Sequence, residues 1–329
     1  MDTIPKHYNV YRRAHELIHL SPNNALKWIA NECMARHNRQ RGKSPITIAI
    51  EATNHCNRSC ATCPHPNLLS SEKGFMELDL FKTIADEFPR LPALTSVAFT
   101  GFGEPLLHPE LIAMSRYVKD KGIPIVRTYT NGILLKEKSE DILQQSGFDE
   151  IILSLNGANP AVHETITQSK EYCSIIDNIE YFFKKRRALN KRTPFISLQI
   201  LKLNDVAYNK EAFIRHWQPL LRPGDCILFK ESHTFAGQVG NSKVKNVFHP
   251  AKRVPCGHLW NFLLVAWNGE VLPCCVDPHR KLSIGSSHHS SLMDLWHSTK
   301  LEDMRNKHLQ GRYEQMDLCR DCETWRYFT

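Results

Sequence analysis

The sequence of 329 residues predicts an α/β fold, a partial (β/α)6 barrel of the TIM-like type followed by a smaller, cysteine-containing C-terminal domain. Three observations predict it. Strand-like and helix-like segments alternate from residue 46, this alternation stops after residue 235, and cysteines gather at motif spacing in both parts. Alternating strands and helices are typical of a parallel sheet. The chain is also long enough for one large and one small domain.

The chain divides into three expected parts, which are a helical extension at 1–45, a barrel at 46–235 and a C-terminal domain at 236–329. In the first part, apolar residues recur at helical intervals over 25–36, after a Ser21-Pro22 step that can start a helix. Glycine, asparagine, serine and proline over 237–250 indicate a linker into the last part.

Within the barrel, apolar and β-branched runs predict strands at 46–52, 95–101, 124–130, 150–155, 194–203 and 226–231. Helical periodicity predicts helices at 77–88, 109–121, 137–146, 174–190 and 208–219. Six β/α units in this span fit a partial barrel, and such barrels bind their ligands at the carboxyl ends of the strands.

Composition excludes several classes of function. Apolar content of 42% and charged content of 23% are ordinary for a globular protein, and no apolar run is long enough to cross a bilayer. The N-terminus lacks the apolar core of a signal peptide, so we expect a cytoplasmic protein without a membrane partner. The net charge of +8 favours anionic partners only weakly. The densest basic run, 184–187, reads as a solvated helix end, because no nucleic-acid reader motif accompanies it.

The 11 cysteines are many for a cytoplasmic chain, and their number is odd. Without an export signal, disulfides are a poor explanation, and metal ligation is a better one. Three cysteines, Cys56, Cys60 and Cys63, form a C-x3-C-x2-C loop directly after the first predicted strand. Thiolates are the usual ligands of iron–sulfur clusters, and three of them leave one iron open for a ligand that is not protein. Zinc held with His55 or His65 is the alternative.

A C-x3-C-x2-C triplet after the first strand resembles the radical S-adenosylmethionine (SAM) superfamily. The resemblance implies that Cys56, Cys60 and Cys63 hold a catalytic [4Fe–4S] cluster whose open iron is chelated by the amino and carboxylate groups of SAM. The reduced cluster would then cleave SAM to methionine and a 5′-deoxyadenosyl radical. Reduction implies an electron donor such as flavodoxin or ferredoxin.

Further short motifs end the next three strands. The segment Gly101-Phe102-Gly103-Glu104-Pro105 resembles the G-G-E-P segment of the family, with Phe102 in place of one glycine. The resemblance implies that Gly103, Glu104, Asn131, Ser154 and Asn156 contact SAM. For Glu104 the physical basis is a charge-assisted hydrogen bond to an ammonium group. The alternative for Asn131 and Asn156 is ordinary turn chemistry, because Asn-Gly is a common tight turn.

The C-terminal cysteines form a second pattern. Residues 262–267 and 270–272 flank Asn268-Gly269, which is a strong hairpin signal. The C-x12-G-x4-C spacing from Cys256 to Cys274, the helix start near Trp296 and a trailing C-x2-C resemble the SPASM/twitch extension. Since no cysteine follows the last pair, the shorter twitch form with one auxiliary [4Fe–4S] cluster matches better. The implied ligands are Cys256, Cys274, Cys319 and Cys322, with Cys275 as an alternative to Cys274 and zinc as an alternative metal.

A closed cluster near the pocket could accept an electron from a substrate radical. We therefore expect two-electron oxidation of a small polar metabolite such as a sugar or an aminocyclitol. Peptide or protein modification is the first alternative. A radical epimerase is the second and needs a thiol at the pocket, for which Cys173, Cys226 and Cys275 are spare, although each is expected to be a core residue. A non-catalytic iron–sulfur or zinc protein is the alternative from a different functional class.

Overall fold

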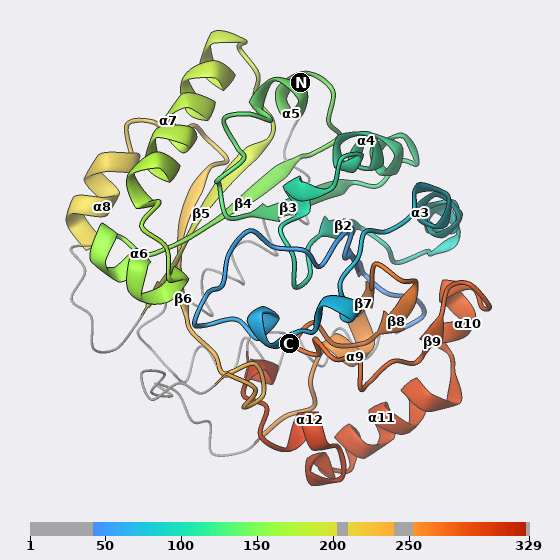
Figure 1. Cartoon of the computed structure of the whole chain (residues 1–329). Coiled ribbons are helices and arrows are strands. Elements are labelled where there is room, and N and C mark those ends of the chain that lie inside the picture. Colours follow the sequence, from blue (N-terminus) through green and yellow to red (C-terminus); the bar gives the residue numbers. More distant parts are fainter. Residues whose placement is uncertain (1–41, 203–209, 240–252, 327–329) are drawn as a thin grey trace.

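The computed structural model describes residues 42–202, 210–239 and 253–326 (Figure 1). These residues form one nine-stranded sheet with the strand order β6-β5-β4-β3-β2-β1-β7-β8-β9. The strands are β1 (Thr47–Ile50), β2 (Ser96–Phe99), β3 (Ile125–Thr130), β4 (Glu150–Asn156), β5 (Phe195–Lys202), β6 (Cys226–Glu231), β7 (Phe262–Val265), β8 (Glu270–Leu272) and β9 (Gly285–Ser286). The helix predicted over 25–36 lies outside the described residues.

Strands β1 to β6 are parallel to their neighbours and follow chain order, so each pair needs a crossover segment. Helices supply most of these crossovers and lie on the outside of the curved sheet (Figure 1). They are α3 (Leu78–Ala85), α4 (Leu111–Asp120), α5 (Ser139–Gln144), α6 (Pro160–Thr167), α7 (Tyr172–Ala188) and α8 (Lys210–Trp217). The predicted partial barrel is confirmed.

One barrel helix, α6, was not predicted. Its start carries ordinary signals, because the Asn159 side chain accepts a hydrogen bond from the Val162 amide (2.9 Å) and Pro160 occupies the first turn. Half of its eight residues are β-branched, which lowers helix propensity and weakens the helical signal. The helix anchors the cysteine loop, because the Ala61 amide in that loop donates a hydrogen bond to the Ile166 carbonyl of α6 (2.9 Å).

The main core lies between the outer face of the sheet and the helices. In β2, Val97 and Phe99 are fully buried, and Phe99 packs on Phe81 of α3 with ring centroids 6.0 Å apart. The buried face of α3 consists of Phe81, Ile84 and Ala85, which recur at helical spacing. Burying this apolar face is the main driving force for docking the helix.

The C-terminal segment joins the same sheet. The predicted hairpin is confirmed, with Leu264 opposite Leu272 and Val265 opposite Val271 in antiparallel β7 and β8. Its first strand pairs in parallel with β1, Thr47 opposite Phe262, which no sequence pattern indicated. Helices α9 (His258–Asn261), α10 (Leu292–Trp296), α11 (Thr299–Leu309) and α12 (Asp317–Arg320) complete this part. The three-domain division remains a prediction.

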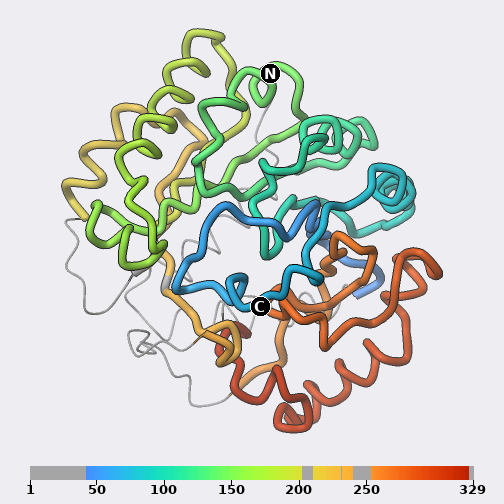
Figure 2. The backbone as a smooth tube through the Cα atoms, in the orientation of Figure 1, coloured from blue at the N-terminus to red at the C-terminus, as the bar shows by residue number. Residues whose placement is uncertain are grey.

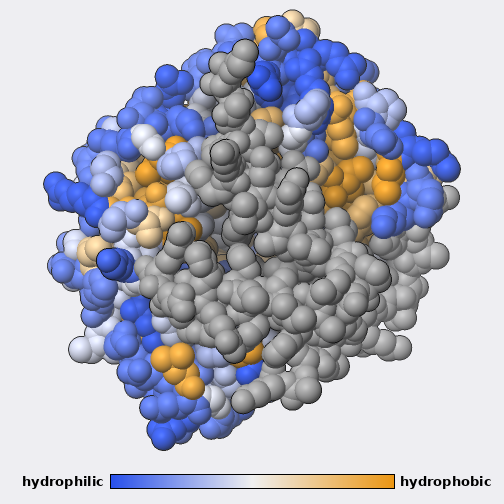
Figure 3. Space-filling model, turned by 180° about the vertical axis from the view of Figure 1, so that it is seen from behind, coloured by the Kyte–Doolittle hydropathy of each residue, from blue (hydrophilic) through white to orange (hydrophobic). Residues whose placement is uncertain are grey.

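The tube view shows the blue segment after β1 lying between the green barrel strands and the orange C-terminal elements (Figure 2). A hydrogen bond from Trp267 Nε1 to the Glu72 carbonyl (3.2 Å) joins these two regions. Seen from behind, the described surface is largely hydrophilic, with apolar side chains gathered in a few places (Figure 3). Among the described helices, none is both long and apolar enough to cross a membrane.

Candidate active site

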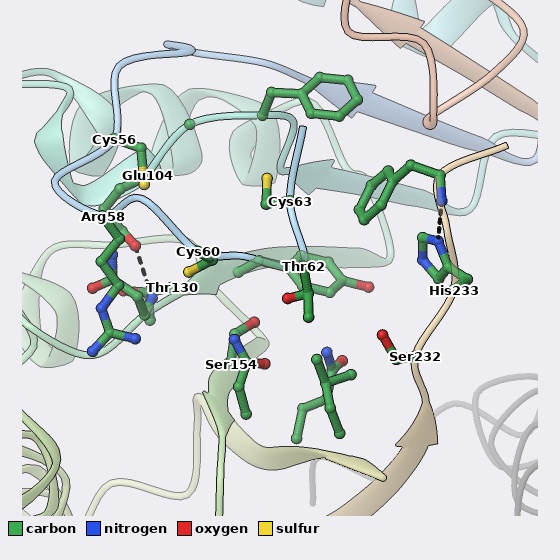
Figure 4. A pocket seen from close by; sticks show the side chains of 18 residues that line it. Cys56, Arg58, Cys60, Thr62, Cys63, Glu104, Thr130, Ser154, Ser232 and His233 are labelled. Carbon is green, nitrogen blue, oxygen red and sulfur yellow. Dashed lines mark hydrogen bonds between the residues drawn. The ribbon is translucent and has the colours of Figure 1, made fainter. Parts of the chain in front are cut away.

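A pocket lies at the carboxyl ends of the barrel strands (Figure 4). Its lining comes from the loop after β1, the loop after β2 and the ends of β3, β4, β5 and β6. Every residue predicted for the first site lines it, namely Cys56, Cys60, Cys63, Gly103, Glu104, Asn131, Ser154 and Asn156. The fold thus brings together residues from four separate parts of the sequence, as a parallel barrel does. Their individual roles remain predictions.

The three cysteine side chains face a common space in this pocket (Figure 4). Burial raises the pKa of Cys56 to about 11 and that of Cys63 to about 12. As free thiols these groups are therefore neutral at pH 7. Cluster ligands are thiolates, so the site fits a cationic iron centre that compensates their charge and displaces their protons.

The spacing of the thiols also bears on the metal. Among the described residues, no three Cys, His, Asp or Glu side chains lie close enough together to hold a single metal ion. Zinc draws its thiolates to about 2.3 Å from one centre, whereas a cluster spreads them over separate irons. His65, the alternative zinc ligand, instead bonds the Asn54 carbonyl through Nε2 (2.8 Å). The cluster therefore stays the prediction for this site, with zinc as the alternative metal.

Glycine is needed in the loop after β2 because two backbones meet there. A Cβ on Gly103 would lie 2.2 Å from the Thr53 carbonyl oxygen and 2.7 Å from Asn54 Cα. The next residue, Glu104, donates its amide to the His55 carbonyl (2.8 Å). This contact places the Gly103-Glu104 step directly against the loop that carries the cysteines. This tight packing explains why the second glycine of the G-x-G-E-P segment has no room for a side chain.

The Glu104 carboxylate connects two strand ends. It is 2% exposed and accepts hydrogen bonds from the Asn131 amide (2.7 Å) and the Leu106 amide (3.1 Å). Burial raises its pKa, while these amides act in the opposite direction. A buried carboxylate has about four lone-pair sites, so Glu104 can accept a further donor such as an ammonium group. Glu104 therefore also orients Asn131, which the motif alone did not indicate.

We expect Glu104→Ala to weaken SAM binding by about tenfold or more, because it removes a charge-assisted hydrogen bond and frees the end of β3. Iron content should stay at the wild-type level, since no cluster ligand changes. Equilibrium dialysis with SAM and an iron assay measure both quantities. Glu110→Ala is the matched control, because Glu110 is an exposed carboxylate six residues away. Unchanged SAM affinity in Glu104→Ala would contradict the assignment.

A second carboxylate, Glu51, was missed by sequence reasoning. It follows β1, is 3% exposed, and accepts a hydrogen bond from the Phe102 amide (2.9 Å). Burial raises the pKa of Glu51, whereas the hydrogen bond from the Phe102 amide and the charge of Arg280 lower it. The available signal was an acidic residue at the end of an apolar strand, which is rarely buried without a partner. Glu51 holds the Gly101-Phe102 turn in the position that the pocket needs.

Arg58 and His163 were also missed. Arg58 lies between two cluster cysteines in sequence, is 6% exposed, and has Nη2 at 3.3 Å from His163 Nε2. His163 Nδ1 is 2.8 Å from the Leu155 carbonyl oxygen. A carbonyl only accepts, so Nδ1 carries the proton and Nε2 accepts from Arg58. Burial lowers the pKa of His163, which keeps it neutral. Arg58 Nε and Nη1 lack partners among the described residues, leaving a buried cation beside the thiols.

Five cysteines gather in the C-terminal part, the predicted Cys256, Cys274, Cys319 and Cys322 together with Cys275. Burial, followed by the nearby Cys322 thiol, raises the pKa of Cys275 and of Cys319 to about 12. The pKa of Cys256 and of Cys274 is raised as well, first by burial and then by neighbouring thiols. Four thiolates suffice to close a cluster. The choice between Cys274 and Cys275 stays open.

Separate elements carry these cysteines. The β7–β8 hairpin leads into Cys274 and Cys275, and α12 carries Cys319. The Cys256 amide is 3.2 Å from His308 Nδ1, and the Cys322 amide donates to the Cys319 carbonyl (3.2 Å). Cys274, Cys275 and Cys322 pack around one small apolar cluster of Ala236, Val276 and Leu318. The hairpin and the terminal C-x2-C meet as the sequence predicted.

The three spare cysteines named for the epimerase alternative lie outside the pocket lining. Cys226 lies in β6 with its sulfur 3.2 Å from Ser197 Oγ, and Cys275 belongs to the C-terminal group. The prediction that Cys173 is a core residue is wrong, because it is exposed near the start of α7. None of these three described residues lines the pocket.

Family models match both parts of the chain. The model of the radical SAM superfamily matches residues 50–194, and the SPASM model, an iron–sulfur cluster-binding domain, matches residues 256–323. The chain is 24% identical to the S-adenosyl-L-methionine-dependent 2-deoxy-scyllo-inosamine dehydrogenase of Niallia circulans over 84% of this chain and 91% of that protein. A tungsten-containing aldehyde ferredoxin oxidoreductase cofactor-modifying protein of Pyrococcus furiosus is 28% identical over 47% of this chain and 43% of that protein.

Solved structures show the same fold. BtrN in complex with AdoMet and 2-DOIA aligns with a TM-score of 0.57 at 19% identity, covering 85% of this chain and 93% of that chain. SuiB of Streptococcus suis bound to precursor peptide SuiA aligns with a TM-score of 0.60 at 13% identity, covering 86% of this chain and 72% of that chain. At these identities the likeness concerns the fold alone.

Proposed function

The chain belongs to the radical SAM superfamily, and on that premise we propose that it is an oxidoreductase that dehydrogenates a small polar metabolite, such as a sugar or an aminocyclitol. It binds SAM and a [4Fe–4S] cluster through its radical SAM domain and an auxiliary iron–sulfur cluster through its SPASM domain. The proposal includes the three-part division at residues 45 and 235, with the barrel and C-terminal parts carrying one cluster each.

The arrangement of thiols carries this proposal. Three cysteines, Cys56, Cys60 and Cys63, line the pocket, whereas the C-terminal group has enough thiols to close a cluster. When both are bound, a reduced cluster and SAM would together supply a 5′-deoxyadenosyl radical that takes a hydrogen atom from a substrate C–H bond. Oxidation of an alcohol to a ketone must then release one more electron and one proton. The C-terminal cysteines would hold a group that can take this electron.

The pocket residues position the reactants. Ser154 and Asn156 both line the pocket, on either side of the buried Leu155. Asn156 has a positive φ of 65°, and the pairing of β4 with β5 shifts register between Ser154 and Asn156. A shifted register re-aims side chains at strand ends. With Glu104 and Asn131, these side chains would orient SAM, while Gly103 lets the backbone approach it.

The dehydrogenase in Niallia circulans supports oxidation of a small molecule, because its match extends over most of both chains. Modification of a peptide is the second candidate, because SuiB, which has a precursor peptide bound in its structure, shares this fold. Either candidate would need an external electron donor, such as flavodoxin or ferredoxin, and we propose neither a nucleic-acid nor a membrane partner.

The decisive measurement is the mass of the product. Reconstituted enzyme with SAM, dithionite and 2-deoxy-scyllo-inosamine should form 5′-deoxyadenosine together with a product that has lost two hydrogens. The same assay is run with a panel of unprotected sugars. An epimerase would instead give a product of unchanged mass in ordinary water and a product with one deuterium when the reaction is run in heavy water. Turnover only with peptides would favour the second candidate.

A further inference from the structure

The pocket has a second end, formed by β5 and β6, whose residues no motif singled out as a group. On the side away from Cys60, Ser232 and His233 line the pocket just after β6 (Figure 4). We propose that this end is the substrate subsite and that it takes an uncharged, hydroxyl-bearing part of the substrate, with His233 donating a hydrogen bond to a substrate oxygen. The proposal rests on the proposed function, because it names the substrate class of that site.

The hydrogen bonds of His233 determine its tautomer. Its Nδ1 lies 3.3 Å from the Phe235 amide nitrogen, and an amide can only donate, so Nδ1 is the acceptor. In a neutral imidazole the proton must then reside on Nε2. Burial lowers the pKa of His233 to about 4, so the ring is neutral at pH 7. Nε2–H has no hydrogen-bond partner among the described residues and is left as a donor for a ligand.

Aromatic packing keeps the ring in this position. The His233 ring lies 4.3 Å from the Phe235 ring, and Phe235 in turn lies 6.1 Å from Phe102. Phe102 belongs to the loop that carries Gly103 and Glu104. The subsite is therefore packed directly against the predicted SAM-binding loop, which places a bound substrate oxygen next to that loop.

Two further groups at this end have unused hydrogen-bonding capacity. The Oε1 atom of Gln199 is buried and has no partner among the described residues. Ser232 is 8% exposed, and its hydroxyl makes no hydrogen bond within the described part of the chain. A buried carboxamide oxygen without a partner costs free energy, which a hydrogen bond from a ligand hydroxyl could recover. The three side chains thus offer a mixture of donors and acceptors, which suits hydroxyl groups.

Charge defines the substrate class. The charged side chains in the lining are Arg58 and Glu104, and both belong to the cysteine side of the pocket. The lining from β5 and β6 consists of Gln199, Leu201, Ser232, His233 and Phe235, with His233 neutral. The neighbouring Lys230 does not line the pocket, and burial lowers its pKa to about 8, while the charge of Glu150 acts in the opposite direction. Among the described residues that line this end, none is a cation that could compensate a phosphate or a carboxylate.

The test uses holoenzyme with SAM and three named probes, 2-deoxy-scyllo-inosamine, myo-inositol and myo-inositol 1-phosphate. Formation of 5′-deoxyadenosine should rise above the substrate-free rate with at least one of the first two probes and not with the phosphate. His233→Ala should then raise KM for that probe about tenfold, as expected for one lost hydrogen bond in a buried site. His233→Gln should restore most of it, because the Gln amide reaches the Nε2 position. SAM affinity and iron content should not change.

A second readout needs no substrate. In nitrogen-15 histidine spectra, the signal that His233→Gln removes should have the shifts of a neutral ring protonated at Nε2. His289→Ala, an exposed histidine, is the matched control for the kinetics. The subsite would be overturned if only myo-inositol 1-phosphate raised 5′-deoxyadenosine formation. It would also be overturned if none of the three probes raised it while the enzyme still cleaved SAM slowly. An unchanged KM in His233→Ala or an Nδ1-protonated ring would overturn the role of His233. Failure of the wild type to cleave SAM at all would instead contradict the proposed function.

Discussion

Replacing Cys56, Cys60 and Cys63 together with alanine is expected to abolish SAM cleavage and to remove about half of the iron. Wild-type enzyme reconstituted without oxygen should contain about eight irons and eight sulfides per chain, which is two [4Fe–4S] clusters. The triple variant should retain about four of each, because the C-terminal cysteines are untouched. The effect is large because all three thiols face one space, so the change removes all three predicted protein ligands of this cluster (Figure 4).

The control for this variant is Cys173→Ala, which removes an exposed cysteine of α7 that does not line the pocket. It should keep the full iron content and the full rate of 5′-deoxyadenosine formation. The assignment of the triplet would be wrong if the triple variant still cleaved SAM. It would also be wrong if Cys173→Ala lost as much iron as the triple variant.

The second large effect is expected from Cys319→Ala combined with Cys322→Ala. Cys322 packs with Cys274 and Cys275, Cys319 lies near Cys322, and neither Cys319 nor Cys322 lines the pocket. The double variant should still form 5′-deoxyadenosine but should lose the oxidised product, because the second electron of the substrate has no acceptor. Iron should fall to about four per chain. Mass spectrometry of the products and an iron assay on one preparation give both answers.

The same assays show whether Cys274 or Cys275 is the cluster ligand after the hairpin. Cys274→Ala and Cys275→Ala are matched variants of adjacent cysteines, and the variant that loses the ligand should resemble the double variant. Undiminished oxidised product in the Cys319/Cys322 double variant would contradict the electron-accepting role. Zinc in place of iron in the C-terminal site of the purified protein would contradict it as well.

Sequence reasoning predicted the barrel because its signals are local. Each strand from β1 to β6 is a short apolar or β-branched run, and helical periodicity predicted five barrel helices, which are α3, α4, α5, α7 and α8. Helix α6 was missed because half of its eight residues are β-branched, which weakens the helical signal, and its cap gives the main one. The cysteine motifs were equally readable, since their spacing alone brings the side chains of one loop together.

Taken alone, the sequence determined the order of strands and helices, the two groups of cysteines and the loops expected to bind SAM, because these depend on neighbours along the chain. Tertiary structure decided what depends on distant residues. The parallel pairing of β7 with β1, the bond from Glu104 to the Asn131 amide and the contact of Arg58 with His163 each join segments 27 or more positions apart. No local propensity encodes such contacts, because they form only when burial forces a polar group to find a partner that the fold has brought near.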